Sequence, residues 1–209
     1  MSEKIKLYGY RWVVLGVFML INITIQMLWI SFAPVTSLAT EFYGVTDLKI
    51  GLLSMTFMIA YIPLSLPISW MIDTWGFRKS VSLGAILMGV FGILRGLAGS
   101  NYGLVLGSTS GIAVAQPFLL NSWTTVPAKW FSIEERATAV GMVTLSSLVG
   151  TGIGMVVPPI LVEGGMPIPQ VQLWFGIIAA ATSVLFIALA RATPPTPPCE
   201  AGKEERALM

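Results

Sequence analysis

The chain of 209 residues is 55% hydrophobic and only 11% charged, and its mean hydropathy is +0.81. A soluble domain carries about 25% charged residues, so the charged side chains here cannot cover a water-facing surface, and the solvent around the chain is lipid. A net charge of +2, the single Cys199 and the absence of histidine argue against nucleic-acid binding, a disulfide framework, a cysteine metal site and histidine-based catalysis.

The N-terminal residues place Lys4, Lys6 and Arg11 before an apolar run, as a signal peptide does. This run is longer than the apolar region of a signal peptide, and further apolar segments follow it. The sequence therefore predicts a first membrane helix that is retained.

Six apolar segments are long enough to cross a bilayer, which takes about 20 residues each. They are residues 12–38, 50–72, 80–98, 103–126, 138–161 and 171–191. Because short linkers make neighbouring helices antiparallel, we predict an all-α, multi-pass membrane protein with one compact six-helix bundle. In this division residues 1–11 precede the bundle, residues 12–191 form it, and residues 192–209 are a Pro-rich and then charged linker or tail.

Basic residues are unevenly distributed over the linkers. Those that share a side with the two termini are Lys4, Lys6, Arg11, Arg78, Lys79, Lys129, Arg136, Arg191, Lys203 and Arg206. The alternate linkers hold only Lys49, and Arg95 falls inside the third segment near its outer end. Because cytoplasmic loops carry the excess of lysine and arginine, we predict a plasma-membrane protein with both termini in the cytoplasm.

Glycine is frequent within the segments, and proline lies inside the second and fifth of them. The prolines are Pro63, Pro67, Pro158 and Pro159. Small residues allow helices to pack closely in lipid, which is the simplest reason for the glycines. The prolines are expected to kink their helices, which serves rocking motions but is also common in membrane helices without them.

The linker after the second segment carries Asp73, Gly76, Arg78 and Lys79 in the order D-x-x-G-x-R-K. This pattern resembles the loop after the second transmembrane helix of the major facilitator superfamily, although Ser69 stands where that family usually has glycine. The resemblance implies a gating loop in which the Asp73 carboxylate pairs with Arg78 or accepts hydrogen bonds from a helix N-terminus. The alternative is an ordinary basic flank of a membrane helix.

Polar and large aromatic side chains recur at helical spacing inside four of the segments. They are Asn22, Gln26 and Trp29; Ser54, Met58, Tyr61 and Ser65; Thr109, Gln116 and Trp123; and Thr144, Ser147 and Thr151. In lipid such groups face the bundle interior. For the serines and threonines we favour hydrogen bonds between helices, whereas Gln26, Trp29 and Gln116 favour the lining of a cavity. No carboxylate lies at membrane depth, so proton coupling is unsupported.

Short sequence matches extend in consistent order and spacing over about residues 11–162. They are Arg11-Trp12-Val13-Val14, Phe42-Tyr43-Gly44-Val45, Leu53-Ser54-Met55, Tyr61-Ile62-Pro63-Leu64, Pro67, Trp70, Ala115-Gln116, Trp130-Phe131, Glu135, Val157-Pro158-Pro159 and Leu161-Val162. With these residues the chain resembles the N-terminal half of the feline leukaemia virus subgroup C receptor-related family within the facilitators. The resemblance implies transport of choline or ethanolamine, with haem as an earlier candidate substrate in that family.

The same resemblance implies a substrate site. Trp29, Gln116 and Met58 fall on that family's cavity tryptophan, glutamine and methionine, and an indole face can hold a quaternary ammonium by cation–π attraction. Gln116 would orient the solute hydroxyl, and Arg95 falls on a basic position of that family, for which a structural or gating role and a binding role are both open. The predicted substrate contacts are Asn22, Gln26, Trp29, Met58, Tyr61, Gln116 and Trp123. Ile25 and Leu28 differ from the family's polar neighbours of that tryptophan.

We therefore predict one half of a twelve-helix facilitator that moves a small organic solute, such as a choline-like cation, by alternating access. The other half is expected in the same protein, in a separate partner or in a second copy. One alternative is a facilitator for an organic anion such as haem or for a drug-like solute, and another is a non-transporting receptor or assembly protein. No cofactor motif, metal cluster or nucleophile–base pair supports an enzyme.

Overall fold

The computed structural model describes residues 7–196 and residue 198, and all the regular structure in this part of the chain is helical. The helices are α1 (Arg11–Ile30), the 3₁₀ helix η1 (Ala33–Val35), α2 (Thr36–Tyr43), α3 (Asp47–Trp75), α4 (Phe77–Leu97), α5 (Tyr102–Leu120), α6 (Thr125–Trp130), α7 (Ile133–Glu163) and α8 (Ile168–Leu189). Among the basic residues used for orientation, Lys4, Lys6, Lys203 and Arg206 lie outside the described residues, as does Cys199.

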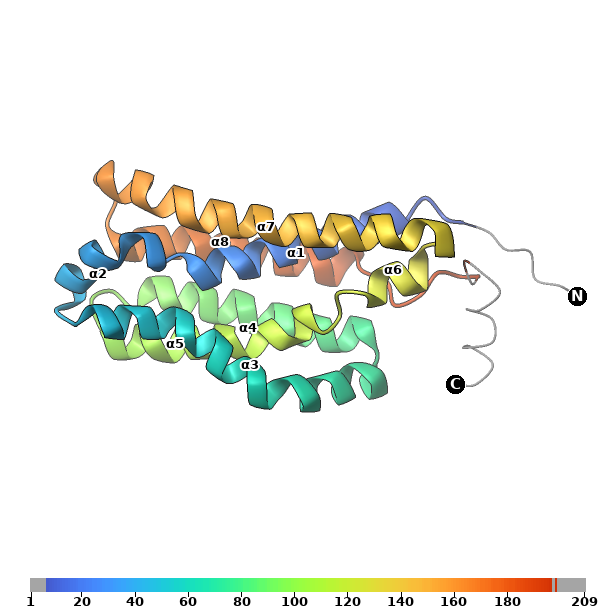
Figure 1. Ribbon diagram of the computed structural model, residues 1–209, viewed down its shortest axis with the longest axis horizontal. Coiled ribbons are helices and arrows are strands. Elements are labelled where there is room, and N and C mark those ends of the chain that lie inside the picture. Colours follow the sequence, from blue (N-terminus) through green and yellow to red (C-terminus); the bar gives the residue numbers. More distant parts are fainter. Residues whose placement is uncertain (1–6, 197, 199–209) are drawn as a thin grey trace, which may run out of the picture.

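Within the described residues, six stretches of helix are long and apolar enough to cross a membrane. The six-helix membrane fold predicted from the sequence is confirmed. Several helices extend beyond the predicted ends: α3 begins three residues earlier than expected, and α7 begins five residues earlier. The prolines in α3 and α7 lie inside continuous helices, and α3 bends along its length (Figure 1).

Two of the membrane segments are interrupted, which the sequence did not indicate. The first is broken at Ser31 and Phe32, just before a 3₁₀ turn in which Pro34 has no N–H to donate to the preceding turn. The fourth is broken between α5 and α6, where the backbone N–H groups of Ser122, Trp123 and Thr125 each bond to the carbonyl three residues earlier. These tighter turns end α5 and re-aim the chain into α6.

The six spans form two layers of helices (Figure 1). One layer holds α7, α1 and α8, and the other holds α4, α5 and α3. The layers meet mainly where α4 packs along α8, although these helices are far apart in the sequence. A cluster of rings joins the layers: the ring centroids of Phe18, Phe77 and Phe186 lie 5.6 to 6.5 Å apart in tilted or edge-to-face pairs.

The bundle has two recognisable ends (Figure 1). The end at which α1 begins and α8 finishes also holds the α3–α4 and α6–α7 turns, and it is called the Arg11 end below. The other end holds the α2–α3, α4–α5 and α7–α8 turns and is called the Tyr43 end. The Tyr10 hydroxyl donates to the Leu189 carbonyl oxygen at 2.8 Å, so the first and last helices are fastened together at the Arg11 end.

Glycines bring selected helix pairs into backbone contact. A Cβ added at Gly150 of α7 would collide with the Ile23 backbone of α1, and one added at Gly154 would lie 2.8 Å from the Met27 carbonyl oxygen. Gly92 of α4 and Gly176 of α8 face each other in the same way. Close packing predicted from the glycines is therefore correct at these positions, but it does not apply to every glycine of the spans.

We expect Gly150→Ala to lower the melting temperature of the protein and Gly152→Ala to leave it unchanged or raise it. Alanine adds about 1 kcal/mol of helix propensity at both positions. At Gly150 the new methyl group must push α1 away from α7, which costs about 1–3 kcal/mol, whereas nothing lies within 4 Å of a Cβ at the exposed Gly152. Thermal unfolding of the two variants in detergent checks this order, and equal melting temperatures would contradict it.

Candidate functional site

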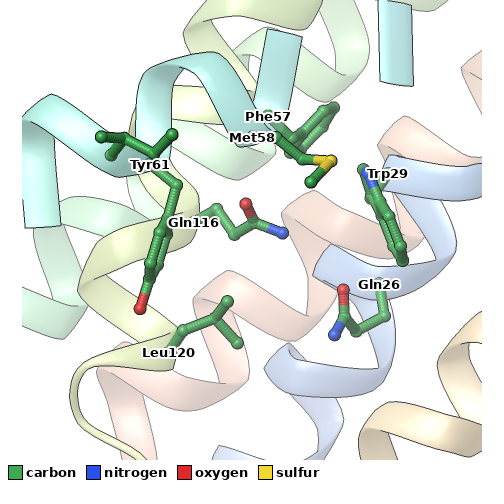
Figure 2. Close-up of a pocket in the computed structure, with 8 residues that line it drawn as sticks. Gln26, Trp29, Phe57, Met58, Tyr61, Gln116 and Leu120 are labelled. Atoms are coloured by element: carbon green, nitrogen blue, oxygen red, sulfur yellow. The ribbon is translucent and has the colours of Figure 1, made fainter. Parts of the chain in front are cut away.

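A cavity of about 300 Å³ lies between α1, α3 and α5 (Figure 2). Its lining residues are Gln26, Trp29, Phe57, Met58, Tyr61, Ile62, Gln116 and Leu120. Helical spacing explains the set, because residues three or four apart on one helix share a face, and three such faces meet here. The structure thus brings together five side chains that the sequence marked as substrate contacts: Gln26, Trp29, Met58, Tyr61 and Gln116.

The indole of Trp29 is fixed at one side of the cavity by bonds to α3. Its Nε1–H donates to the Ser54 carbonyl oxygen at 3.2 Å, and the Ser54 hydroxyl donates to the Trp29 carbonyl oxygen at 3.3 Å. This reciprocal pair consumes the indole N–H and leaves the ring to face the cavity (Figure 2). Trp29 therefore offers a solute its π-face and no hydrogen-bond donor.

Tyr61 lies across the cavity from Trp29, with Gln116 between them (Figure 2). The Tyr61 hydroxyl donates to Oδ1 of Asn121 at 2.8 Å. Its proton is thereby directed to a protein acceptor, while the phenol oxygen keeps lone pairs that a solute donor could use. As with Trp29, the aromatic group lines the cavity but its donor is already engaged.

The two glutamines of the cavity have unused hydrogen-bonding capacity. Gln116 is buried, and neither Gln26 nor Gln116 makes a side-chain hydrogen bond to any described residue. Oε1 of Gln26 is fully buried without a partner. Buried polar groups in proteins are almost always satisfied, so these carboxamides are the groups of the cavity best suited to bind a polar solute.

The lining of the cavity is electrically neutral, because it contains no acidic or basic side chain. Arg95, which the sequence placed near the outer end of the third segment, lies elsewhere. Its side chain is 1% exposed, and its guanidinium lies 5.5 Å from the Phe32 ring centroid. Nη1 of Arg95 donates to the Leu28 carbonyl oxygen at 2.9 Å, and Nη2 donates to the Ser31 hydroxyl at 3.3 Å. Arg95 thus caps the broken end of α1, which supports the structural role and not solute binding.

Asn22 and Trp123, also predicted as substrate contacts, do not line the cavity. Asn22 is buried among the helices, and its Nδ2 donates to the Phe18 carbonyl oxygen of its own helix at 2.8 Å. Trp123 lies in the turn after α5, and its Nε1–H donates to the Thr144 hydroxyl of α7 at 3.3 Å. The seven-residue spacing from Gln116 to Trp123 keeps two residues on one face only in a continuous helix, and α5 ends between them.

Three apolar lining residues, Phe57, Ile62 and Leu120, were not identified from the sequence, and neither was Asn121. Phe57 and Ile62 flank the predicted Met58 and Tyr61 on α3. Both could have been predicted from the sequence if the cavity-facing side of α3 had been taken as one residue wider on each side. Asn121 gave no periodic signal, because it lies at the end of α5 and acts through contacts that only the tertiary packing creates.

The loop with the D-x-x-G-x-R-K pattern lies at the Arg11 end, away from the cavity. Gly76 has a φ of +85° and its N–H bonds to the Ile72 carbonyl oxygen, which allows the sharp turn from α3 to α4. Nη2 of Arg78 donates to the Ile187 carbonyl oxygen of α8 at 3.2 Å. Asp73 and Lys79 are exposed, and no ion pair joins Asp73 to Arg78 within the described residues.

A helical bundle with six spans and a cavity among its helices, lined by apolar and aromatic groups and two glutamines, defines a multi-pass membrane protein. Residues 9–208 match the Major Facilitator Superfamily, and the chain belongs to this family. The superfamily predicted from the sequence is thereby confirmed.

Individual relatives agree with the narrower resemblance. The chain is 30% identical over 192 residues to the rat "Choline/ethanolamine transporter FLVCR2", which covers 89% of this chain and 35% of the relative. It is 32% identical over 206 residues to "Solute carrier family 49 member A3" of Xenopus tropicalis, a match that covers 93% of this chain and 43% of the relative. It is 29% identical over 210 residues to "Choline/ethanolamine transporter FLVCR1" of the cat, a match that covers 96% of this chain and 38% of the relative. The chain therefore spans less than half the length of these curated relatives, which are named as transporters or carriers and not as enzymes.

We expect Arg95→Ala to lower the free energy of unfolding by about 3 kcal/mol, because it removes two charge-assisted hydrogen bonds and leaves the Leu28 carbonyl with the 3.1 Å bond from the Ser31 hydroxyl in place of two donors. Arg95→Lys retains the charge but lacks the planar fork of donors, so the free energy of unfolding of this variant should lie between those of wild type and Arg95→Ala. Thermal unfolding in detergent measures both variants. Arg78→Ala is the matched control, since this exposed guanidinium makes a single bond to α8 and its removal should change little; an equal loss in both alanine variants would contradict the capping role.

Proposed function

We propose that the chain is the N-terminal half of a facilitator-type transporter that moves a small organic cation of the choline type by alternating access. The observation that carries the proposal is the state of the two aromatic donors in the cavity. The N–H of Trp29 and the O–H of Tyr61 are both donated to protein acceptors, so the aromatic groups of the cavity present ring faces and an oxygen lone pair to a solute. Such a lining attracts positive charge although it contains no carboxylate.

Substrate size and charge both fit this proposal. A volume of about 300 Å³ is at the small end of ligand sites and suits a compact solute better than a macrocycle such as haem. Two propionates would also call for basic side chains, and Arg95 is engaged at the broken end of α1. The names of the choline and ethanolamine transporters among the relatives support the same class of solute.

The carboxamides of Gln26 and Gln116 are proposed to form hydrogen bonds with the polar end of the solute. A quaternary ammonium over the Trp29 ring would leave a hydroxyl within the part of the cavity that holds Gln116, Gln26 and Tyr61. Gln116 can then donate to or accept from that hydroxyl, which would satisfy a group that is otherwise buried and unpaired. Met58 supplies a polarisable contact for the methyl groups of the ammonium.

The remaining half of the transporter is proposed to cover the exposed faces of α3 and α7, which are the least buried spans of the bundle. It would be part of the same protein, a separate polypeptide or a second copy. Of the eight described basic residues, six lie at the Arg11 end (Arg11, Arg78, Lys79, Lys129, Arg136 and Arg191), and Lys49 and Arg95 lie toward the Tyr43 end. This asymmetry supports a cytoplasmic location for that end in the plasma membrane, with the loop of Asp73, Gly76, Arg78 and Lys79 at the inner gate.

Choline is expected to quench the tryptophan fluorescence of the full-length protein in a saturable manner through contact with Trp29. In variants that lack this indole, binding is measured by calorimetric titration: Trp29→Phe keeps a weaker π-face and should bind choline with reduced affinity, whereas Trp29→Ala should abolish saturable binding. Trp123→Phe is the control, because this indole bonds to Thr144 outside the cavity and its loss should leave the affinity unchanged. Retention of full affinity in a folded Trp29→Ala protein would rule out this assignment.

Gln116→Leu is expected to weaken the binding of choline by about fivefold to tenfold and to leave the binding of tetramethylammonium nearly unchanged. The two ligands share the quaternary ammonium, and only choline carries the hydroxyl that Gln116 is proposed to orient. Calorimetric titration of wild type and variant with both ligands measures the difference. An equal loss for both ligands would show that Gln116 acts on the ammonium site or on the shape of the cavity.

A further inference from the structure

Asn121 ends α5 next to the cavity and connects the cavity wall to α3. Its neighbour Leu120 lines the cavity, and its own amide contacts three α3 side chains that follow one another at four-residue spacing: Tyr61, Ser65 and Ser69. Nδ2 lies 2.9 Å from the Ser65 carbonyl oxygen and 2.9 Å from the Ser69 hydroxyl, and Oδ1 lies 2.8 Å from the Tyr61 hydroxyl.

The Ser65 carbonyl settles which way this amide faces. A backbone carbonyl can only accept, so the nitrogen of the Asn121 amide has to face Ser65 and the oxygen has to face Tyr61. An amide oxygen can only accept as well, so the Tyr61 hydroxyl has to donate. The direction of the phenolic proton is therefore determined by a backbone group of α3, through Asn121.

We propose that Asn121 is a specificity-determining positioning residue of the cavity: by holding the proton of the Tyr61 hydroxyl, it makes this end of the cavity an acceptor and selects against solutes that carry an anionic group there. This inference rests on the proposed transport of an organic cation and explains how Asn121 affects the choice among such cations. A solute hydroxyl can donate to the phenol oxygen, whereas a solute carboxylate beside Tyr61 meets the lone pairs of that oxygen and is repelled by them, which leaves it only the N–H groups of the glutamines as donors.

The same amide also fixes where the Tyr61 ring stands. Pro63 and Pro67 lack the N–H groups that would otherwise bond one turn back, so α3 loses backbone hydrogen bonds on both sides of Ser65. Asn121 bonds to α3 between these prolines and just after them. It thereby holds the weakened part of α3, and with it Tyr61, against the end of α5.

The adjacent side chain in the same turn provides a control for purely structural effects. Trp123 donates to the Thr144 hydroxyl and so fastens this turn to α7 on the other side, without contact with the cavity. Thr144→Val removes that hydrogen bond and preserves side-chain shape. It should affect stability and leave the choice of solute unchanged.

The test compares choline with glycine betaine, which carries the same trimethylammonium group and a carboxylate in place of the hydroxymethyl group. Affinities of both ligands are measured by titration of the full-length protein, for wild type, Asn121→Ala, Tyr61→Phe, the double variant and Thr144→Val. Wild type should bind choline in preference to betaine. In Asn121→Ala the freed hydroxyl can turn toward a carboxylate, so the preference should fall about tenfold, chiefly through tighter binding of betaine.

Tyr61→Phe should also reduce the preference, chiefly through weaker binding of choline by about fivefold, while betaine should bind slightly more tightly because the oxygen that repels its carboxylate is gone. In the Tyr61→Phe background the further change Asn121→Ala should have no effect on the ratio, because no phenolic proton remains to be directed. Tyr61→Phe leaves the bonds from Asn121 to α3 in place, so it keeps the inference testable if Asn121→Ala does not fold.

Two failures can be distinguished. If the wild-type protein binds neither ligand, the proposed cation transport is wrong and this inference is withdrawn with it. If wild type binds choline but the ratio is unchanged in Asn121→Ala, or falls equally in Thr144→Val, the specificity role of Asn121 is overturned while the cation site stands. An unchanged ratio in a folded Tyr61→Phe protein overturns it in the same way.

Discussion

The bundle depends on one constraint of the bilayer: a helix can be interrupted only where other groups satisfy the backbone polar groups that the interruption frees. Two spans are broken, and both breaks are served by polar side chains. The guanidinium of Arg95 reaches the Leu28 carbonyl at the end of α1, and the Ser122 hydroxyl donates to the Phe118 carbonyl at the end of α5. Since the surrounding lipid offers no hydrogen bonds, these side chains replace the water that would stabilise the same turns in a soluble protein.

The cavity lies between these two breaks. α1 and α5 run in opposite directions, so the break of α1 after Trp29 falls on the Tyr43 side of the cavity and the break of α5 after Leu120 falls on the Arg11 side. Each break is adjacent in sequence to a lining residue. Trp29 and Leu120, which line the cavity, thus lie within two residues of the capped ends of α1 and α5. The positions of these side chains depend on how those helix ends are capped.

The membrane fold could be predicted from hydropathy, because a bilayer imposes a minimum length on every span and six segments exceed it. Helical periodicity also identified one cavity-facing stripe per helix: Gln26 with Trp29, and Met58 with Tyr61. Periodicity fails where a helix stops, which is why Trp123 was assigned to the cavity face although it contacts Thr144. It fails for Asn121 too, since the role of this amide arises from the packing of α3 against α5, which no local pattern specifies.

The neutral lining of the cavity bears on what drives the solute across the membrane. None of the residues that line the cavity is acidic or basic, so this part of the chain contributes no group that could release or take up a proton to balance the cation proposed above. Each elementary charge gains about 2.3 kcal/mol for every 100 mV of membrane potential, negative inside. For the monovalent organic cation proposed above, this corresponds to about a 50-fold concentration ratio per 100 mV at equilibrium wherever its charge crosses the bilayer uncompensated.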